Sequence, residues 1–320
     1  SIEDSKERPG DGAGHTPAKS DRDTEWSVNP GARIGAKVKN GDIGGGFEYG
    51  TMGGNANLRL LYGTWNFGAG QLLIGQNYPP CNLIISNEAF FAGIYASNGV
   101  LYEGRRPMIQ LRFGDFKFAL VQPGTGGSAT ITGVVTGGEV DTTLPKIEAK
   151  YTFRTDRFRV GVVGGYNSYE VNSDMKDYDV DSWVAALWGQ VNMGPAYVKG
   201  NVFKAINGGA FGLASSGDDD FDFVGNKVKD VDTLAYVLIA GAKLNEMFAV
   251  QAAYGHINHD SDVVGAKDDE TTSYYVQTTI TLAPGVSITP EVGRVDYEKN
   301  SANVKEGDET YVGALWQVYF

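Results

Sequence analysis

Apolar and polar side chains alternate with a period of two through most of this chain, and this pattern constrains the fold more than any other feature. It is clearest in residues 26–38, 146–154 and 274–282, where every second residue is apolar and most of the residues between are charged or polar. A β-strand places successive side chains on opposite faces of a sheet. The alternation therefore predicts an all-β protein whose strands have one apolar face and one polar face.

No stretch approaches the roughly 18 consecutive apolar residues that a membrane-spanning helix needs. The longest apolar run lies near residues 236–242, and the 44 glycines are spread along the chain instead of forming a linker. A transmembrane barrel alternates residues that face lipid with residues that face a water-filled lumen, so it has no long apolar run. The sequence therefore excludes membrane helices and predicts a transmembrane antiparallel β-barrel.

The connections between the predicted strands alternate between short turns and longer polar segments. Residues typical of hairpin turns form short connections at residues 40–42, 67–68, 114–115, 155–156, 194–195, 244–246 and 284–285. The longer connections are residues 79–107, 122–143, 170–181, 206–231, 257–270 and 298–308, with one shorter connection at residues 51–55. Outer-membrane barrels have short turns on the periplasmic side and long loops outside. This rhythm predicts one sheet that crosses a membrane repeatedly.

The count of strand-like segments is about fifteen, whereas bacterial barrels made of one chain have even numbers of strands. We therefore expect sixteen strands, with the first lying upstream of Ser1 or in a separate piece of the same protein. Residues 1–24 are predicted to be an extracellular loop or leader, and residues 25–320 a single barrel domain.

Composition excludes several other classes of protein. The formal net charge of -12 argues against nucleic acid as a partner, because such proteins need a basic surface to neutralise phosphates. Cys81 is the single cysteine, so the chain has neither an intrachain disulfide nor a site with several cysteine ligands. The sequence also has no nucleophile elbow of the G-x-S-x-G type and no P-loop.

Two segments resemble the Gram-negative general porins. The chain ends in phenylalanine, and the preceding alternate positions are apolar: Val312, Ala314, Trp316, Val318 and Phe320. This pattern is similar to the closing strand of outer-membrane proteins. Residues 58–76 are similar to the porin hairpin that precedes an inward-folding third loop, here residues 79–107, although Gln76 stands where porins often have arginine.

The resemblance implies a sixteen-stranded homotrimer in the bacterial outer membrane, surrounded by lipid and lipopolysaccharide. Its function would be passive diffusion of small hydrophilic solutes through a water-filled channel, with no cofactor and no enzymatic activity. A barrel of this size needs something to narrow it, and the third loop would do so.

Charged residues on the predicted lumen side would then act as an electrostatic filter. Glu88 and Glu103 of the third loop are expected to face the passage. The basic residues expected opposite them are Arg33, Lys37, Arg59 and Arg112, with Lys117, Lys146, Lys150 and Arg154 farther around the barrel. This excess of basic residues favours small anions, and Arg33 and Arg59 are the first candidates. The alternative is that these are solvated charges balanced by acidic lumen residues.

Acidic residues in the predicted outer loops act against this anion preference. They include Asp218, Asp219, Asp220 and Asp222, whose carboxylates are candidate ligands for a loop-bound Ca²⁺. Such an ion would link the protein to lipopolysaccharide, whereas simple solvated loop charge is the other explanation.

Three other functions remain open from the sequence, and one of them is a soluble β-sandwich lectin. The barrel could be an adhesin or receptor that uses its acidic loops as the contact surface. It could also be an outer-membrane hydrolase with His256 at the rim, or bind a metal through His256 and His259.

Overall fold

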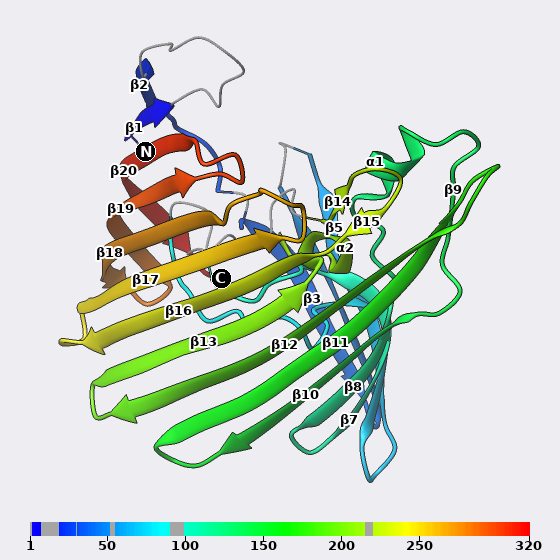
Figure 1. The fold of residues 1–320 in the computed structure, drawn as a ribbon. Coiled ribbons are helices and arrows are strands. Elements are labelled where there is room, and N and C mark those ends of the chain that lie inside the picture. The colour runs from blue at the N-terminus through cyan, green and yellow to red at the C-terminus, as the bar shows by residue number, and fades with distance from the viewer. Residues whose placement is uncertain (1, 8–18, 30, 52–54, 90–98, 215–219) are drawn as a thin grey trace.

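A computed structural model describes residues 2–7, 19–29, 31–51, 55–89, 99–214 and 220–320. In these residues, fifteen strands of 6 to 16 residues follow one another as antiparallel neighbours in one curved sheet (Figure 1). They are β3 (Arg33–Asn40), β4 (Ile43–Gly50), β5 (Asn57–Asn66), β6 (Gln71–Asn77), β7 (Arg106–Phe113), β8 (Phe116–Val121), β10 (Lys146–Arg154), β11 (Phe158–Asn172), β12 (Tyr178–Met193), β13 (Ala196–Ile206), β16 (Val231–Lys243), β17 (Phe248–Ser261), β18 (Asp269–Ala283), β19 (Val286–Lys299) and β20 (Lys305–Val318). The all-β barrel architecture predicted from the alternation is confirmed.

The seven predicted short turns all lie between consecutive strands, at one end of the sheet (Figure 1). Gly41 and Gly114 have φ values of 58° and 57° in two of these turns, a conformation that glycine adopts without the steric penalty of a side chain. The longer connections lie at the opposite end. They contain the small elements α1 (Ser128–Thr132), β9 (Glu139–Asp141), α2 (Gly208–Phe211), β14 (Asp222–Phe223) and β15 (Val228–Lys229).

Several strand ends differ from the predicted positions. The first long strand begins at Arg33 and not at Trp26, because a turn precedes it, in which Ala32 donates its N–H to the carbonyl of Asn29 at 2.8 Å. Strands β17 to β20 extend into segments predicted as loops, so the connection predicted at residues 298–308 is reduced to residues 300–304.

Two further strands lie in the segment predicted to be a loop or leader. β1 (Ile2–Glu7) pairs with β20, and β2 (Lys19–Thr24) pairs with β1. At the other end of the sheet β3 pairs, among the described strands, with β4 alone. The strand that we expect upstream of Ser1 stays a prediction.

Each of the fifteen strands exposes at least one large apolar side chain on its outer face. One example from each strand, in chain order, is Ile34, Phe47, Leu61, Ile74, Ile109, Leu120, Tyr151, Val162, Leu187, Val202, Leu238, Tyr254, Val276, Val292 and Trp316. In β20, Trp316 is 68% exposed whereas Tyr311, which points inward, is 1% exposed. A continuous apolar outer surface is unfavourable in water and is what a lipid-facing barrel requires. Within the described residues, no helix is long and apolar enough to cross a membrane.

Candidate functional site

The third loop, residues 78–105, connects β6 to β7, and its described parts, residues 78–89 and 99–105, lie against the inner face of the sheet. Its two legs pair where Leu83 donates its N–H to the carbonyl of Leu101 at 2.8 Å. At one end of its path, Cys81 donates its N–H to the Glu148 carboxylate on β10 at 2.8 Å. At the other, Ala89 donates its N–H to Glu291 on β19, also at 2.8 Å. The loop therefore crosses the interior from one wall to another, as the sequence predicts.

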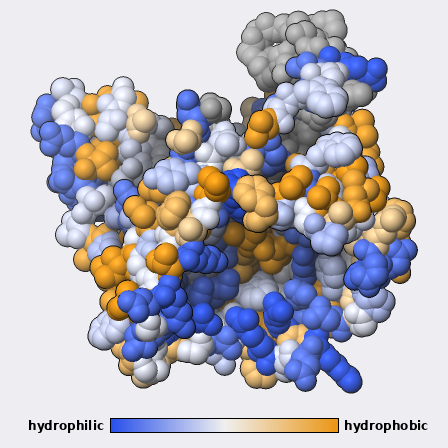
Figure 2. Space-filling model, turned by 180° about the vertical axis from the view of Figure 1, so that it is seen from behind, coloured by the Kyte–Doolittle hydropathy of each residue, from blue (hydrophilic) through white to orange (hydrophobic). Residues whose placement is uncertain are grey.

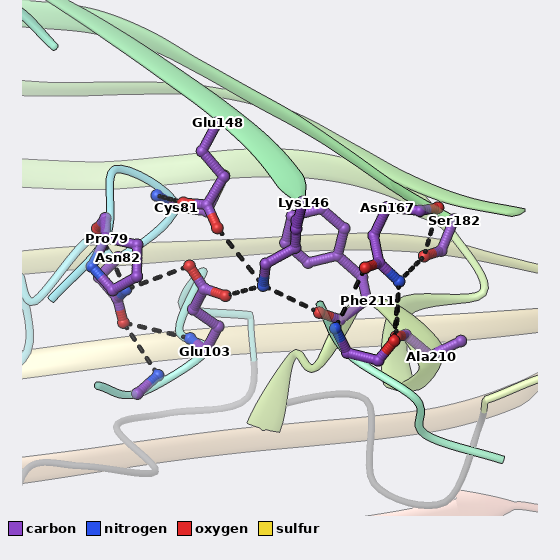
Figure 3. A network of polar contacts seen from close by, with 12 residues as sticks. Pro79, Cys81, Asn82, Glu103, Lys146, Glu148, Asn167, Ser182, Ala210 and Phe211 are labelled. Atoms are coloured by element: carbon purple, nitrogen blue, oxygen red, sulfur yellow. Dashed lines mark hydrogen bonds and ion pairs between the residues drawn. The ribbon is translucent and has the colours of Figure 1, made fainter. Parts of the chain in front are cut away.

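A buried charge cluster fixes the root of this loop to β10 (Figure 3). The ammonium of Lys146 contacts the carboxylate of Glu103 from the loop and lies 3.3 Å from that of Glu148. It also donates to the carbonyl of Phe211 at 3.1 Å. Asn82 accepts the N–H of Glu103 at 3.2 Å and so holds the loop backbone beside the cluster. Burial, together with the neighbouring Glu148 carboxylate, raises the pKa of Glu103 well above its ordinary value.

A second polar cluster holds residues 86–89 of the loop against β17 to β20. Tyr311 donates its hydroxyl proton to the Glu88 carboxylate at 3.0 Å. The hydroxyls of Ser86 and Tyr275 lie 2.8 Å apart, and Gln251 donates to Tyr275 at 2.6 Å. These contacts join residues up to 223 positions apart in the sequence.

The expectation that Glu88 and Glu103 face the passage is corrected by their burial. They are 3% and 4% exposed, respectively. Both carboxylates lie between the loop and the wall, where buried charges need partners. Their role in this structure is to anchor the loop.

Apolar side chains complete the contact between the loop and one side of the interior, which we call the packed side: the inner faces of β11–β13, β16 and β17. The cluster includes Leu83 and Leu101 of the loop, both at most 2% exposed. The residues that face them are Val163, Val184, Ala186, Phe203, Ala205, Phe211, Leu213, Ala235 and Ile257. This side resembles the core of a soluble protein, so it leaves little room for water or solute.

The longer connections beyond β8 and β13 cover the same side. Asn167 on β11 donates to the carbonyls of Gly124 and Ala210, both at 3.2 Å. Gly124 donates its N–H back to Asn167 at 3.1 Å, and the ring of Phe211 in α2 lies 4.2 Å from the Lys146 ammonium. One buried asparagine thus ties two outer connections to the wall above the loop.

The remaining interior, which we call the open side, is bounded by β3–β8 and by the short-turn ends of β10 and β11. Two recesses on this side share Arg112 and Lys117 in their linings. The cationic residues that line one or both recesses are Lys37, Lys39, Arg112, Lys117, Lys150, Arg154 and Arg159. Asp115 is the single carboxylate among the described lining residues. It forms an ion pair with Arg154, in which Oδ1 of Asp115 lies 2.8 Å from Nε of Arg154. Seen from behind, hydrophilic residues gather around the hollowed lower middle of the molecule (Figure 2).

The structure pairs Arg33 and Arg59 with the same carboxylate. Arg59 is 2% exposed and donates from Nε to Glu48 at 2.7 Å and from Nη2 to the Tyr78 hydroxyl at 3.2 Å. Arg33, whose side chain is 51% exposed, lies 3.8 Å from Glu48. Arg59 is the extra residue of a β-bulge between β4 and β5, and bulges redirect side chains. Gln76 donates to the freed carbonyls of Leu58 and Arg59 at 3.2 and 3.0 Å.

Sequence reasoning missed Arg159 as a lumen residue. It lies between the apolar residues Phe158 and Val160 on β11. The alternation of apolar and polar residues at this point could therefore have predicted that Arg159 faces the lumen. Its role depends on β10, where Arg154 lies directly opposite.

The two histidines of the metal and hydrolase hypotheses are not brought together. His256 and His259 are three residues apart on β17 and lie on opposite faces: His256 stacks on Tyr236 outside, with ring centroids 5.5 Å apart, whereas His259 is buried inside. Asp222 contacts the Ser261 hydroxyl. Asp218 and Asp219 lie outside the described residues, and across the residues that are described no group of three or more His, Cys, Asp or Glu side chains could hold a metal.

A curved antiparallel sheet with an apolar outer face, a charged interior and a loop folded across that interior defines a membrane channel of the outer-membrane barrel class. The family model of the Gram-negative porins matches residues 10–300. The chain belongs to this family. No curated protein matches the sequence.

Solved structures with similar folds agree with this assignment. The outer-membrane channel DcaP of Acinetobacter baumannii has a TM-score of 0.74 at 16% identity, over 98% of this chain and 94% of that chain. The anion-selective porin from Comamonas acidovorans has a TM-score of 0.59 at 14% identity, over 100% and 99%. The trimer form of the Vibrio cholerae outer-membrane protein OmpT has a TM-score of 0.56 at 14% identity, over 100% and 97%.

Family and fold together establish the general function. The protein is integral to the outer membrane and forms a channel for passive diffusion of small hydrophilic solutes. The short-turn end of the sheet is therefore the periplasmic end.

Proposed function

We propose that this channel favours small anions, because the third loop fills the packed side and leaves solutes to the basic open side. The observation that carries the proposal is the charge of the open side. Seven cationic residues and one carboxylate line its two recesses, a formal excess of six positive charges (7 − 1 = 6). The carboxylate, Asp115, is paired with Arg154.

Fixed charges act strongly in a narrow passage with low-dielectric walls, since opposite charges are attracted and like charges repelled at close range. The acidic outer loops are separated from this region and are screened over a Debye length of about 8 Å at physiological salt. The basic residues of the open side therefore set the preference. In this account Lys37, Arg112, Lys117 and Lys150 line the path, whereas Arg59, Glu88 and Glu103 position the wall and the loop.

The fold is compatible with such a preference, since one similar structure is that of an anion-selective porin. We also propose a homotrimer, which is supported by the trimer form of the similar OmpT structure. The aromatic and aliphatic outer belt would then contact lipid and lipopolysaccharide where sister subunits do not cover it.

We propose further that the protein has no catalytic activity. His256, the candidate of the hydrolase hypothesis, has its ring stacked on Tyr236 and its Nδ1 3.0 Å from the Thr272 hydroxyl. The Thr272 hydroxyl donates its proton to Glu298 at 3.0 Å, so His256 is not placed to accept that proton as the base of a nucleophile–histidine pair. The channel function accounts for the charged interior without it.

The test is the zero-current potential of the reconstituted protein across a potassium chloride gradient. The native channel should give the sign of a chloride-preferring pore, and Lys37→Glu should reduce the potential because it reverses one lumen charge. Lys227→Glu, which makes the same change on an exposed residue of the outer connection before β15, should leave it close to native. A native potential with the sign of potassium preference would refute the proposal.

A further inference from the structure

Three cationic residues stand directly opposite one another on three adjacent strands of the open side. Arg112 on β7 is paired with Lys117 on β8, and Lys117 is paired with Lys150 on β10. Side chains directly opposite in an antiparallel sheet have their Cβ atoms about 4.5–5.5 Å apart, and like charges in this arrangement are destabilising. We call these three residues the cationic row.

The protein does not neutralise the cationic row. Arg112 donates from Nε to the carbonyl of Gly114 at 2.9 Å, and Lys150 donates to the loop carbonyl of Asn82 at 3.2 Å. Neither partner is charged. In the described part of the chain, no carboxylate lies within ion-pair distance of the row, and the nearby Asp115 is paired with Arg154.

A second cationic pair adjoins the row on its periplasmic side. Arg154 on β10 lies directly opposite Arg159 on β11. All five cations line one recess of about 160 Å³, together with Thr152, Trp188 and Asp115. Since water takes about 30 Å³ per molecule in the liquid, this space is sufficient for a small oxyanion and some of its hydration.

The position of the recess fits a step on the solute path. Lys150 is on the same face of β10 as Lys146 and Glu148, which anchor the third loop. Its ammonium contacts the loop carbonyl of Asn82 and lies 5.3 Å from the centre of the Trp188 ring. A solute that passes the root of the loop therefore meets the row next, before the periplasmic exit.

We propose that the cationic row is a binding station for a compact divalent oxyanion, a refinement that rests on the anion preference proposed above. Coulomb attraction scales with the product of the charges, so a divalent anion gains about twice what chloride gains from the same cations. Arginine adds paired N–H donors that match oxyanion oxygens. A bound divalent anion would relieve the repulsion within the row. Anion binding therefore explains why the protein has three like charges side by side, although they cost stability when no anion is bound.

The test measures block of the single-channel chloride current by sulfate. In the native channel, sulfate should block in a saturable way, and monovalent methanesulfonate should require a much higher concentration. Lys117→Gln should raise the half-blocking concentration of sulfate about tenfold, since it removes a unit charge about 5 Å from a divalent ion. Lys39→Gln, which removes a charge on β3 outside the row, should change it less than about twofold.

A binding measurement checks that folding does not explain the result. Sulfate should raise the thermal unfolding temperature of the native protein, and the increase should be smaller in Lys117→Gln. Lys117→Gln without sulfate should be at least as stable as the native protein, because it removes like-charge contacts.

The outcomes separate the station from the channel's general preference. A chloride-preferring channel in which sulfate does not saturate, or in which Lys39→Gln weakens block as much as Lys117→Gln, would overturn the station and leave the anion preference standing. A potassium-preferring native channel would overturn the preference itself. Stronger block by succinate than by sulfate would show that the site fits separated charges and would overturn the compact-ion proposal.

Discussion

Lys146 of β10 forms a buried ion pair with Glu103 of the third loop, and neither side chain has any exposed surface. The pair includes a second carboxylate, Glu148, at 3.3 Å. One cation is thus shared by two acids, one from the loop and one from the wall. This cation therefore joins the third loop to β10.

Removing Lys146 should release the loop. In Lys146→Met, two buried carboxylates would lose their shared cation, a change that costs about 3–5 kcal/mol when one member of a buried pair is deleted. We expect a lower urea midpoint of unfolding in detergent and a noisier single-channel current. Lys199→Met, which removes a lumen lysine whose ammonium lies 4.9 Å from the centre of the Tyr197 ring, is the matched control and should keep the steady current. A steady native-like current in Lys146→Met would contradict the anchoring role.

The same cluster predicts a pH dependence. Burial and the adjacent Glu148 raise the pKa of Glu103, so between its ordinary pKa and the raised value the folded protein holds a proton that the unfolded chain does not. This contribution to stability is complete below the ordinary pKa and is lost as pH rises through the raised pKa. Relative to Glu103→Gln, the native protein should therefore gain free energy of unfolding as pH falls through the raised pKa toward the ordinary pKa of a glutamate. Parallel pH curves for the two proteins would show that Glu103 titrates normally.

The returning leg of the third loop should not tolerate a side chain at Gly99. Its φ is 104°, and an added Cβ would collide with the backbone carbonyl of Tyr236 on β16. Its own carbonyl accepts from Asn201 at 2.7 Å, so the backbone has little freedom to move. We expect Gly99→Ala to cost about 1–3 kcal/mol through strain and to alter conductance. Gly104→Ala is the control, because Gly104 also has a positive φ, of 84°, but has open space around it. This variant has the backbone strain without the collision. Equal losses of stability in both variants would mean that the contact with β16 is unimportant.

Arg33 and Arg59 should differ in stability but not in selectivity. Neither lines the recesses of the open side, and both form an ion pair with Glu48, so Arg33→Ala and Arg59→Ala should both keep the sign of the zero-current potential. Arg59 is buried, and its loss removes the donor at 2.7 Å from Glu48, which leaves that carboxylate with Arg33 at 3.8 Å while Tyr78 keeps its hydrogen bond from Arg105; we expect a cost of about 1.5–3 kcal/mol for the lost charged hydrogen bond. Thermal unfolding of the two variants is the measurement. Equal unfolding temperatures would contradict the structural role of Arg59.

The alternation in the sequence was sufficient to predict which face of each strand meets lipid. Val312, Ala314, Trp316 and Val318 share the exposed face of β20, as their spacing requires. The turns could also be predicted from the local sequence. A glycine in the left-handed region, Gly41 or Gly114, lies where the chain reverses direction. These features depend on neighbours in the chain and are readable from it.

The orientation of the loop carboxylates could not be predicted in this way. Glu88 is bound by Tyr311, which is 223 residues away, and Glu103 by Lys146, which is 43 residues away. Arg59 was expected on the lumen side, but its burial depends on a bulge that shifts the register between β4 and β5. These contacts depend on which residues, distant in the sequence, meet across the interior of the barrel. No local sequence pattern predicts such contacts.

The most direct test of the account uses introduced cysteines to ask which half of the interior is accessible. The native Cys81 is buried, so the background reaction should be low. Thr64→Cys on the open side should react with an anionic methanethiosulfonate reagent faster than with a cationic one, and Ala186→Cys on the packed side should stay unreactive with both. Rapid labelling of Ala186→Cys, or faster labelling of Thr64→Cys by the cationic reagent, would contradict a loop that closes one side and a basic path along the other.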